Sequence, residues 1–277
     1  MRNFFATLIL LVTLVGVSCQ KEINWDDGSN GDLLVKTLQV TPATNDTNTI
    51  TLQWDAARRL LEYKSTGKVN GTATDILHRI IRNADGTIKK IISKSSLTAG
   101  FLDSTVYTVH YQTGTRLDYV IDTQYTLIGP IGDSTAYTYN PAGYVSSKVS
   151  YTDLLGPWTP SAKESYSYDA NGNLVKRDVL TPDGIGGFDP VSQTTYTYST
   201  HKNMTTMAEE SYIAIGPDNV SKNFPLQSTT NDLVTPANYS TNFSGTQYNQ
   251  YDRPSKTSLS LVPQPPGYDM KLFFFYR

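Results

Sequence analysis

Hydrophobic and polar residues alternate along most of the chain from about residue 46 onward, and residues 166–176 show the pattern most clearly. Tyr166 and Tyr168 stand two apart, Asp-Ala-Asn-Gly-Asn follows, and a second alternating run begins at Leu174. Residues two apart share one face of a β-strand, and Asn-Gly between such runs is typical of a hairpin turn. This segment is therefore predicted to be a β-hairpin.

The same frame recurs in seven units. The leading residue of each unit is aromatic in six cases, and the seven residues are Trp54, Arg82, Tyr111, Tyr139, Tyr168, Tyr198 and Tyr248. Their successive spacings are 28, 29, 28, 29, 30 and 50. The position two residues earlier is apolar or aromatic in six units, and the position six residues later is aliphatic in six. These columns predict one strand face that forms the core.

A repeat of this length holds two strands and two turns, so consecutive strands should pair. The predicted fold class is all-β, a long antiparallel β-meander of about seven hairpin repeats of about 29 residues. So long a sheet must twist, and we expect it to curl or to become barrel-like, with two packed sheets as the alternative. Residues 46–277 are predicted to form a single β-repeat domain, with an insertion or degenerate unit at about 213–240.

The turns between paired strands have a shared chemistry. Asp and Asn side chains accept hydrogen bonds from nearby backbone, and Gly adopts positive φ without steric cost. The predicted repeat-turn residues are Asp55, Gly86, Gly114, Gly143, Asp169, Asn171, Gly172 and Asp252.

The N-terminus carries a different pattern. A short positive start precedes an apolar run from Phe4 to Val17, and Cys19 is the only cysteine of the chain. The run falls short of the roughly 20 residues that span a bilayer. It predicts a signal peptide over residues 1–18, followed at 19–45 by the cysteine and a flexible, polar tether.

Gly16-Val17-Ser18-Cys19 resembles the lipobox of bacterial lipoproteins, and Gln20-Lys21-Glu22 with the acidic residues after it resembles the surface-exported lipoproteins of the Bacteroidetes. The resemblance implies a diacylglycerol and an acyl chain on Cys19, with the membrane as a partner. It also implies an outer-membrane lipoprotein of the cell envelope that is exposed at the surface. Two or more acyl chains anchor a protein stably.

The hairpin units resemble the YD repeats of RHS-like bacterial surface and toxin-shell proteins. Their consensus runs Tyr-x-Tyr-Asp-x-x-Gly-Arg-Leu, and the unit from Tyr166 to Leu174 is the closest match, with Asn173 where Arg is usual. This resemblance implies a β-hairpin repeat and no particular activity.

Composition and motifs narrow the chemistry. The net charge of −2 is too small and too mixed for a nucleic-acid partner. The three histidines lack metal-ligand spacing, and no Gly-x-Ser-x-Gly elbow is present. We therefore assign no catalytic residue, no metal ligand and no cofactor beyond the lipid. Asp-Ser-Thr occurs twice and resembles the short O-glycosylation signal of the Bacteroidetes, which makes Ser104 and Ser134 either acceptors or plain turn residues.

These features predict a lipid-anchored envelope protein with a non-catalytic binding or scaffolding role, whose ligand is a glycan or an envelope protein. One alternative is an envelope glycan hydrolase with two carboxylates supplied by hairpin loops. Another is a periplasmic carrier of an apolar molecule. A membrane-spanning barrel is disfavoured because Lys176-Arg177-Asp178 places charge on both faces of a predicted strand.

Overall fold

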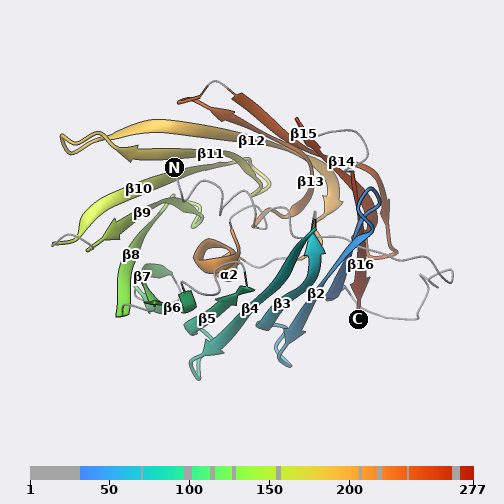
Figure 1. Cartoon of the computed structure of the whole chain (residues 1–277), viewed down its shortest axis with the longest axis horizontal. Helices are drawn as coiled ribbons and strands as arrows, with labels where there is room; N and C mark the ends of the chain where they lie inside the picture. Colours follow the sequence, from blue (N-terminus) through green and yellow to red (C-terminus); the bar gives the residue numbers. More distant parts are fainter. Residues whose placement is uncertain are drawn as a thin grey trace.

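The computed structural model describes residues 32–69, 71–96, 102–112, 116–126, 129–153, 157–205, 208–216, 220–235, 237–263 and 269–277. Within them, sixteen antiparallel strands follow one another in chain order and close into a barrel where β1 pairs with β16 (Figure 1). The all-β meander predicted from the alternation is confirmed, and it is closed. Cys19, the signal peptide and Gly114 lie outside the described residues.

The strands are β1 (Leu34–Thr41), β2 (Asp46–Trp54), β3 (Leu60–Val69), β4 (Thr72–Arg82), β5 (Ile88–Ser95), β6 (Leu102–Tyr111), β7 (Leu117–Thr126), β8 (Gly129–Tyr139), β9 (Val145–Thr152), β10 (Thr159–Tyr168), β11 (Leu174–Pro182), β12 (Phe188–Lys202), β13 (Asn223–Asp232), β14 (Ala237–Tyr248), β15 (Pro254–Val262) and β16 (Met270–Tyr276). Between β12 and β13 lie the short helices α2 (Ala208–Glu210) and η2 (Ser211–Ile215). No helix of the described residues has the length and apolar character needed to cross a bilayer.

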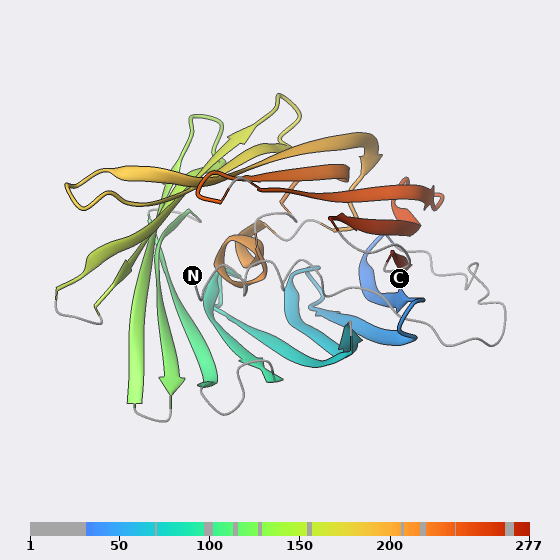
Figure 2. The same ribbon diagram turned by 45° about the horizontal axis from the view of Figure 1, so that its top comes forward.

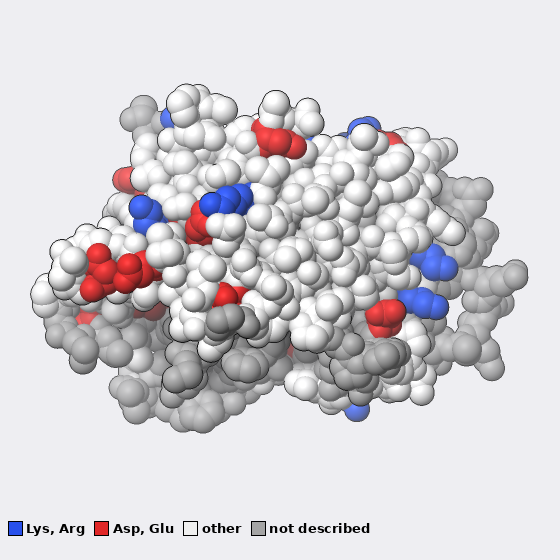
Figure 3. Space-filling view, turned by 90° about the horizontal axis from the view of Figure 1, so that it is seen from above, with Lys and Arg blue, Asp and Glu red and all other residues white. Residues whose placement is uncertain are grey.

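Each strand turns one set of side chains inward and the other outward. On β2, Asn48, Ile50 and Leu52 are buried, whereas Thr47 and Thr51 on the other face are exposed. Similar alternation occurs on β4, and the outward Asp75 and Arg79 there are charged and exposed. The wall over β12, β14 and β15 carries only scattered charges among uncharged residues (Figure 3). Burial of the apolar inward side chains therefore stabilises the barrel, and the polar outer faces of β2 and β4 are compatible with contact with water.

The leading residues of the repeat lie near one end of the barrel. Trp54, Tyr139 and Tyr168 end β2, β8 and β10, and Tyr198 lies near the end of β12. All four pack against the core. The repeat thus corresponds to two strands and a turn, and its columns share one side of a continuous sheet.

Five described turns at this end have a left-handed residue four positions after the leading residue. In the turn at Asp169, the Gly172 N–H donates to Asp169 O at 3.1 Å, and the Asp169 carboxylate accepts from Asn171 N and Asn173 N. Left-handed φ values occur at Arg58 (61°), Gly86 (94°), Gly143 (86°), Gly172 (85°) and Asp252 (65°). The column is therefore defined by backbone conformation, which explains why arginine and aspartate also stand in it.

Two boundaries differ from those assigned from the sequence. β1 falls within the 19–45 segment interpreted as a tether, because its inward positions Thr37, Gln39 and Thr41 are polar and hide the alternation. The insertion lies at 203–222, earlier than 213–240, and Asn203 N donates to Lys222 O at 2.8 Å across its base. Without these twenty residues the 50-residue interval becomes 30, which is one ordinary repeat.

Candidate functional site

The helices α2 and η2 of the insertion lie inside the barrel (Figure 2). The α2 helix is joined to the wall by a buried ion pair, with Arg82 Nη2 2.5 Å from Glu210 Oε1 and both side chains about nine-tenths buried. The neighbouring Glu209 accepts a hydrogen bond from the Tyr111 hydroxyl at 3.1 Å. We call residues 208–215 the plug. The plug is held by side chains of β4 and β6.

Tyrosines of the opposite wall hold the second half of the plug. The Tyr137 hydroxyl donates to Tyr212 O at 3.3 Å, and the hydroxyls of Tyr168 and Tyr212 share a short hydrogen bond. Tyr212 is buried and also meets the ring of Tyr166 edge-on at 5.7 Å. Burial raises the pKa of Tyr212 to about 12, so this hydroxyl stays protonated at neutral pH.

The leading tyrosines also tie each repeat to the one before it. Tyr168 and Tyr198 donate to Val145 O and Leu174 O at 2.9 and 2.6 Å. Tyr111 accepts from Ile88 N at 2.8 Å. Each tie reaches the first residue of the strand that leaves the previous turn. The sequence identified this column as core but missed its hydroxyl contacts. The recurrence of tyrosine, where phenylalanine would fill the same apolar space, is the signal for them.

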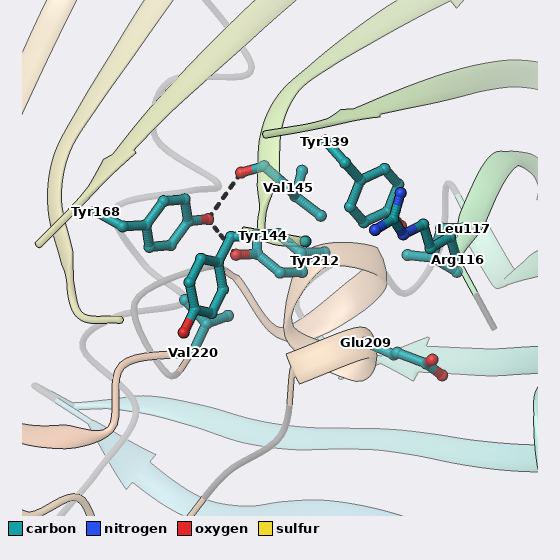
Figure 4. Close-up of a pocket in the computed structure, with 10 residues that line it drawn as sticks. Arg116, Leu117, Tyr139, Tyr144, Val145, Tyr168, Glu209, Tyr212 and Val220 are labelled. Atoms are coloured by element: carbon teal, nitrogen blue, oxygen red, sulfur yellow. Dashed lines mark hydrogen bonds between the residues drawn. The ribbon is translucent and has the colours of Figure 1, made fainter. Parts of the chain in front are cut away.

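A cavity of about 330 Å³ lies between the plug and the turn ends of β6 to β10 (Figure 4). Its wall combines aromatic rings with one cation and one carboxylate: Tyr139, Tyr144, Tyr168, Tyr212, Arg116 and Glu209. Tyr139 and Tyr168 are leading residues of the repeat, Tyr144 lies in the turn between β8 and β9, and Tyr212 belongs to the plug. The size is at the lower end of the range for small-molecule sites.

The two charged groups of the cavity have different surroundings. The Arg116 guanidinium lies over the ring of Tyr139, 5.4 Å from its centroid. Burial, assisted by the adjacent Glu210 charge, raises the pKa of Glu209. The negative charge of Glu209 therefore lacks, among the described residues, a direct ion pair like the one that Arg82 forms with Glu210.

Beyond the plug, the inner face of β9 to β11 carries a charged cluster. Glu164 lies 2.9 Å from Lys148 Nζ and 2.6 Å from Arg177 Nε, and it accepts from the Tyr166 hydroxyl at 3.0 Å. Burial alone would raise the pKa of Glu164, but the charges of Lys148 and Arg177 lower it to about 2. The carboxylate of Glu164 thus has a cation on each side.

A second pair of acids faces the interior from β7 and β8. Asp122 stands opposite Asp133 in the register of the two strands. Burial first, and the charge of Asp133 second, raise the pKa of Asp122 to about 6. A carboxylate with a raised pKa beside a second carboxylate is a known arrangement for acid–base work.

The other sequence-predicted residues lie elsewhere. Ser104 is 8% exposed and stands opposite Tyr125, while Ser134 is half-buried and stands opposite Tyr151. His78 is buried, and its burial lowers its pKa to about 4. Among the described residues, no group of three or more His, Cys, Asp or Glu side chains is arranged to hold a metal ion.

No family model matches the chain, and no curated protein sequence matches it. Among solved structures, it is similar to a porin-like protein from Bacteroides uniformis, with a TM-score of 0.57 and 10% identity over 88% of this chain and 97% of that one. A porin-like protein from Bacteroides vulgatus gives a TM-score of 0.53 and 10% identity over 88% and 98%. At this identity the likeness establishes a shared barrel fold.

Proposed function

We propose that this chain is a lipid-anchored envelope protein whose closed barrel binds a small ligand, without catalysis, in the cavity beside the plug. The cavity carries the proposal, because it is preformed and is lined by side chains that the repeat and the plug hold in place. Such concave sites with a few convergent polar groups are the usual form of a ligand pocket. Among the described residues that line the cavity, Glu209 is the single carboxylate, so the cavity lacks the pair of carboxylates that glycoside hydrolysis needs.

The proposed location at the cell envelope is supported by the N-terminal sequence and by the side chains on the outer wall of the barrel. A lipid on Cys19 would place the barrel on the outer membrane, at the cell surface, as the resemblance of residues 16–22 implies. The charged outward side chains of Asp75 and Arg79 are consistent with a barrel that stands in water beside the membrane.

Filling the cavity is expected to abolish binding. Val220 lines the cavity, and Val220→Trp adds a ring where a ligand would lie. Ligand-observed NMR on the full chain, with a mixture of amino acids, monosaccharides and N-acetyl sugars as probes, should detect at least one binder that this variant loses. Val234→Trp, at a position 68% exposed, is the control and should keep the signal. Absence of any binder, or binding that survives Val220→Trp, would contradict the proposal.

Removing the lipid site is expected to release the protein. Without Cys19 no acyl chain can be attached, so Cys19→Ala should move the chain from the membrane fraction to the soluble fraction. Fractionation followed by immunoblotting measures this. Protease treatment of intact cells tests surface exposure of the unaltered protein. Membrane association that persists in Cys19→Ala would rule out lipid anchoring.

Glycan hydrolysis is the second candidate, because Asp122 and Asp133 form a carboxylate pair with a raised pKa at Asp122. Release of reducing ends from a glycan panel by the full chain would favour it. A carrier of purely apolar molecules is less suited to a cavity that holds both Arg116 and Glu209.

A further inference from the structure

The cavity holds two opposite charges that come from different elements of the fold. Arg116 directly precedes β7 on the barrel wall, and Glu209 belongs to the plug. Figure 4 shows both on one side of the cavity, away from Tyr144 and Tyr168. Each charge therefore reaches the same space from a separately positioned element.

Neither charge is neutralised within the described part of the chain. Arg116 contacts the π-face of Tyr139 and forms no ion pair there. Glu209 accepts one hydrogen bond, from Tyr111, and its neighbour Glu210 takes the contact with Arg82. Arg116 is exposed to solvent, whereas Glu209 is partly buried, and an uncompensated charge at a partly buried site costs free energy. A ligand ammonium group at Glu209 would remove that cost, and a ligand carboxylate at Arg116 would add a charge-assisted hydrogen bond.

The other side of the cavity is aromatic. The rings of Tyr144 and Tyr168 stack with centroids 4.9 Å apart and an interplanar angle of 24°. Tyr212 lies beside them on the plug (Figure 4). Aromatic faces and edges favour a flat apolar ring as a partner.

We propose that the cavity binds a zwitterionic ligand with an aromatic side chain, either a free aromatic amino acid or a dipeptide. Its carboxylate meets Arg116, its ammonium group meets Glu209, and its ring packs on Tyr144, Tyr168 and Tyr212. The volume of about 330 Å³ suits a ligand of this size. This inference rests on the proposed binding function and names the ligand class.

Isothermal titration of the full chain tests it with four probes: L-phenylalanine, the dipeptide Phe-Phe, phenylalanine amide and N-acetylphenylalanine. Arg116→Gln should weaken binding of L-phenylalanine by about ten- to hundredfold, the effect of losing one charge-assisted hydrogen bond. It should leave the already weak binding of the amide unchanged, because the amide has no carboxylate. Glu209→Gln should likewise weaken L-phenylalanine and leave N-acetylphenylalanine unchanged.

The matched controls are Arg79→Gln and Glu62→Gln, which alter a cation and a carboxylate outside the cavity that lie 3.5 Å apart. Both should bind L-phenylalanine as the unaltered chain does. Equal affinity for all four probes, or no binding of the zwitterions, overturns the ligand class. If another probe binds and Val220→Trp removes it, the binding function stands and this inference alone fails. If nothing binds the cavity, both fail.

Discussion

Replacing Arg82 by methionine is expected to lower the free energy of unfolding by about 3–5 kcal/mol, because it leaves the Glu210 carboxylate buried without a partner. The Arg82 guanidinium lies 2.5 Å from Glu210, and it also donates to Gly86 O and Leu60 O at 2.9 and 3.1 Å. The side chain thus holds the plug and the β4–β5 turn together. Urea denaturation followed by circular dichroism measures the loss.

The controls separate the buried pair from the loss of a charge as such. Arg79→Met removes an arginine from the same strand whose side chain is 61% exposed, and it should change stability by at most about 0.5 kcal/mol. The double variant Arg82→Met with Glu210→Met should recover part of the loss, since no unpaired charge remains. Equal effects of Arg82→Met and Arg79→Met would refute the role of the pair.

Arg82 also shows why the repeat could be read from the sequence while the plug could not. The leading column is aromatic in six units, and Arg82 is the exception. The alternation and the turns depend on residues close in sequence, so they predict the hairpins. The partner of Arg82 is 128 residues away, in a segment with no motif. Closure of the barrel depends on the still more distant pairing of β1 with β16.

The insertion was misplaced for a related reason. β13 and β14 carry polar residues on both faces, so the period-two signal fades there. Inward Thr230 pairs with Thr194 through its hydroxyl at 2.9 Å, and outward Gln227 pairs with Asn242 at 2.8 Å. Hydrogen bonds between paired strands therefore stabilise β13 and β14, where alternating apolar side chains are lacking. The cavity combines the tyrosine column, seen in the sequence, with Glu209 of the plug, which only the folded chain brings to it.

Stability is expected to peak near pH 4–5, because two interior carboxylates titrate in opposite directions. The pKa of Glu164 falls from 4.5 to about 2 on folding, so its contribution is complete above pH 4.5 and is lost as the pH drops toward 2. The pKa of Asp122 rises from 3.8 to about 6, so its contribution is complete below pH 3.8 and is lost as the pH rises through 6. Each limb amounts to about 3 kcal/mol. Urea midpoints at pH 3, 4.5 and 7 measure the profile.

Two variants test which carboxylate causes the loss of stability on the acid side and which causes the loss on the alkaline side of the profile. Asp122→Asn should remove the fall between pH 4 and 6 and raise stability at pH 7 by about 3 kcal/mol. Glu164→Gln should flatten the acid limb and destabilise the protein at pH 7 by about 3–5 kcal/mol, because Lys148 and Arg177 would face each other without their shared anion. Asp75→Asn on the outer wall is the control and should leave the profile unchanged. A profile that keeps rising to pH 7 in the unaltered chain would show that Asp122 ionises freely, and the strained carboxylate pair would have to be abandoned.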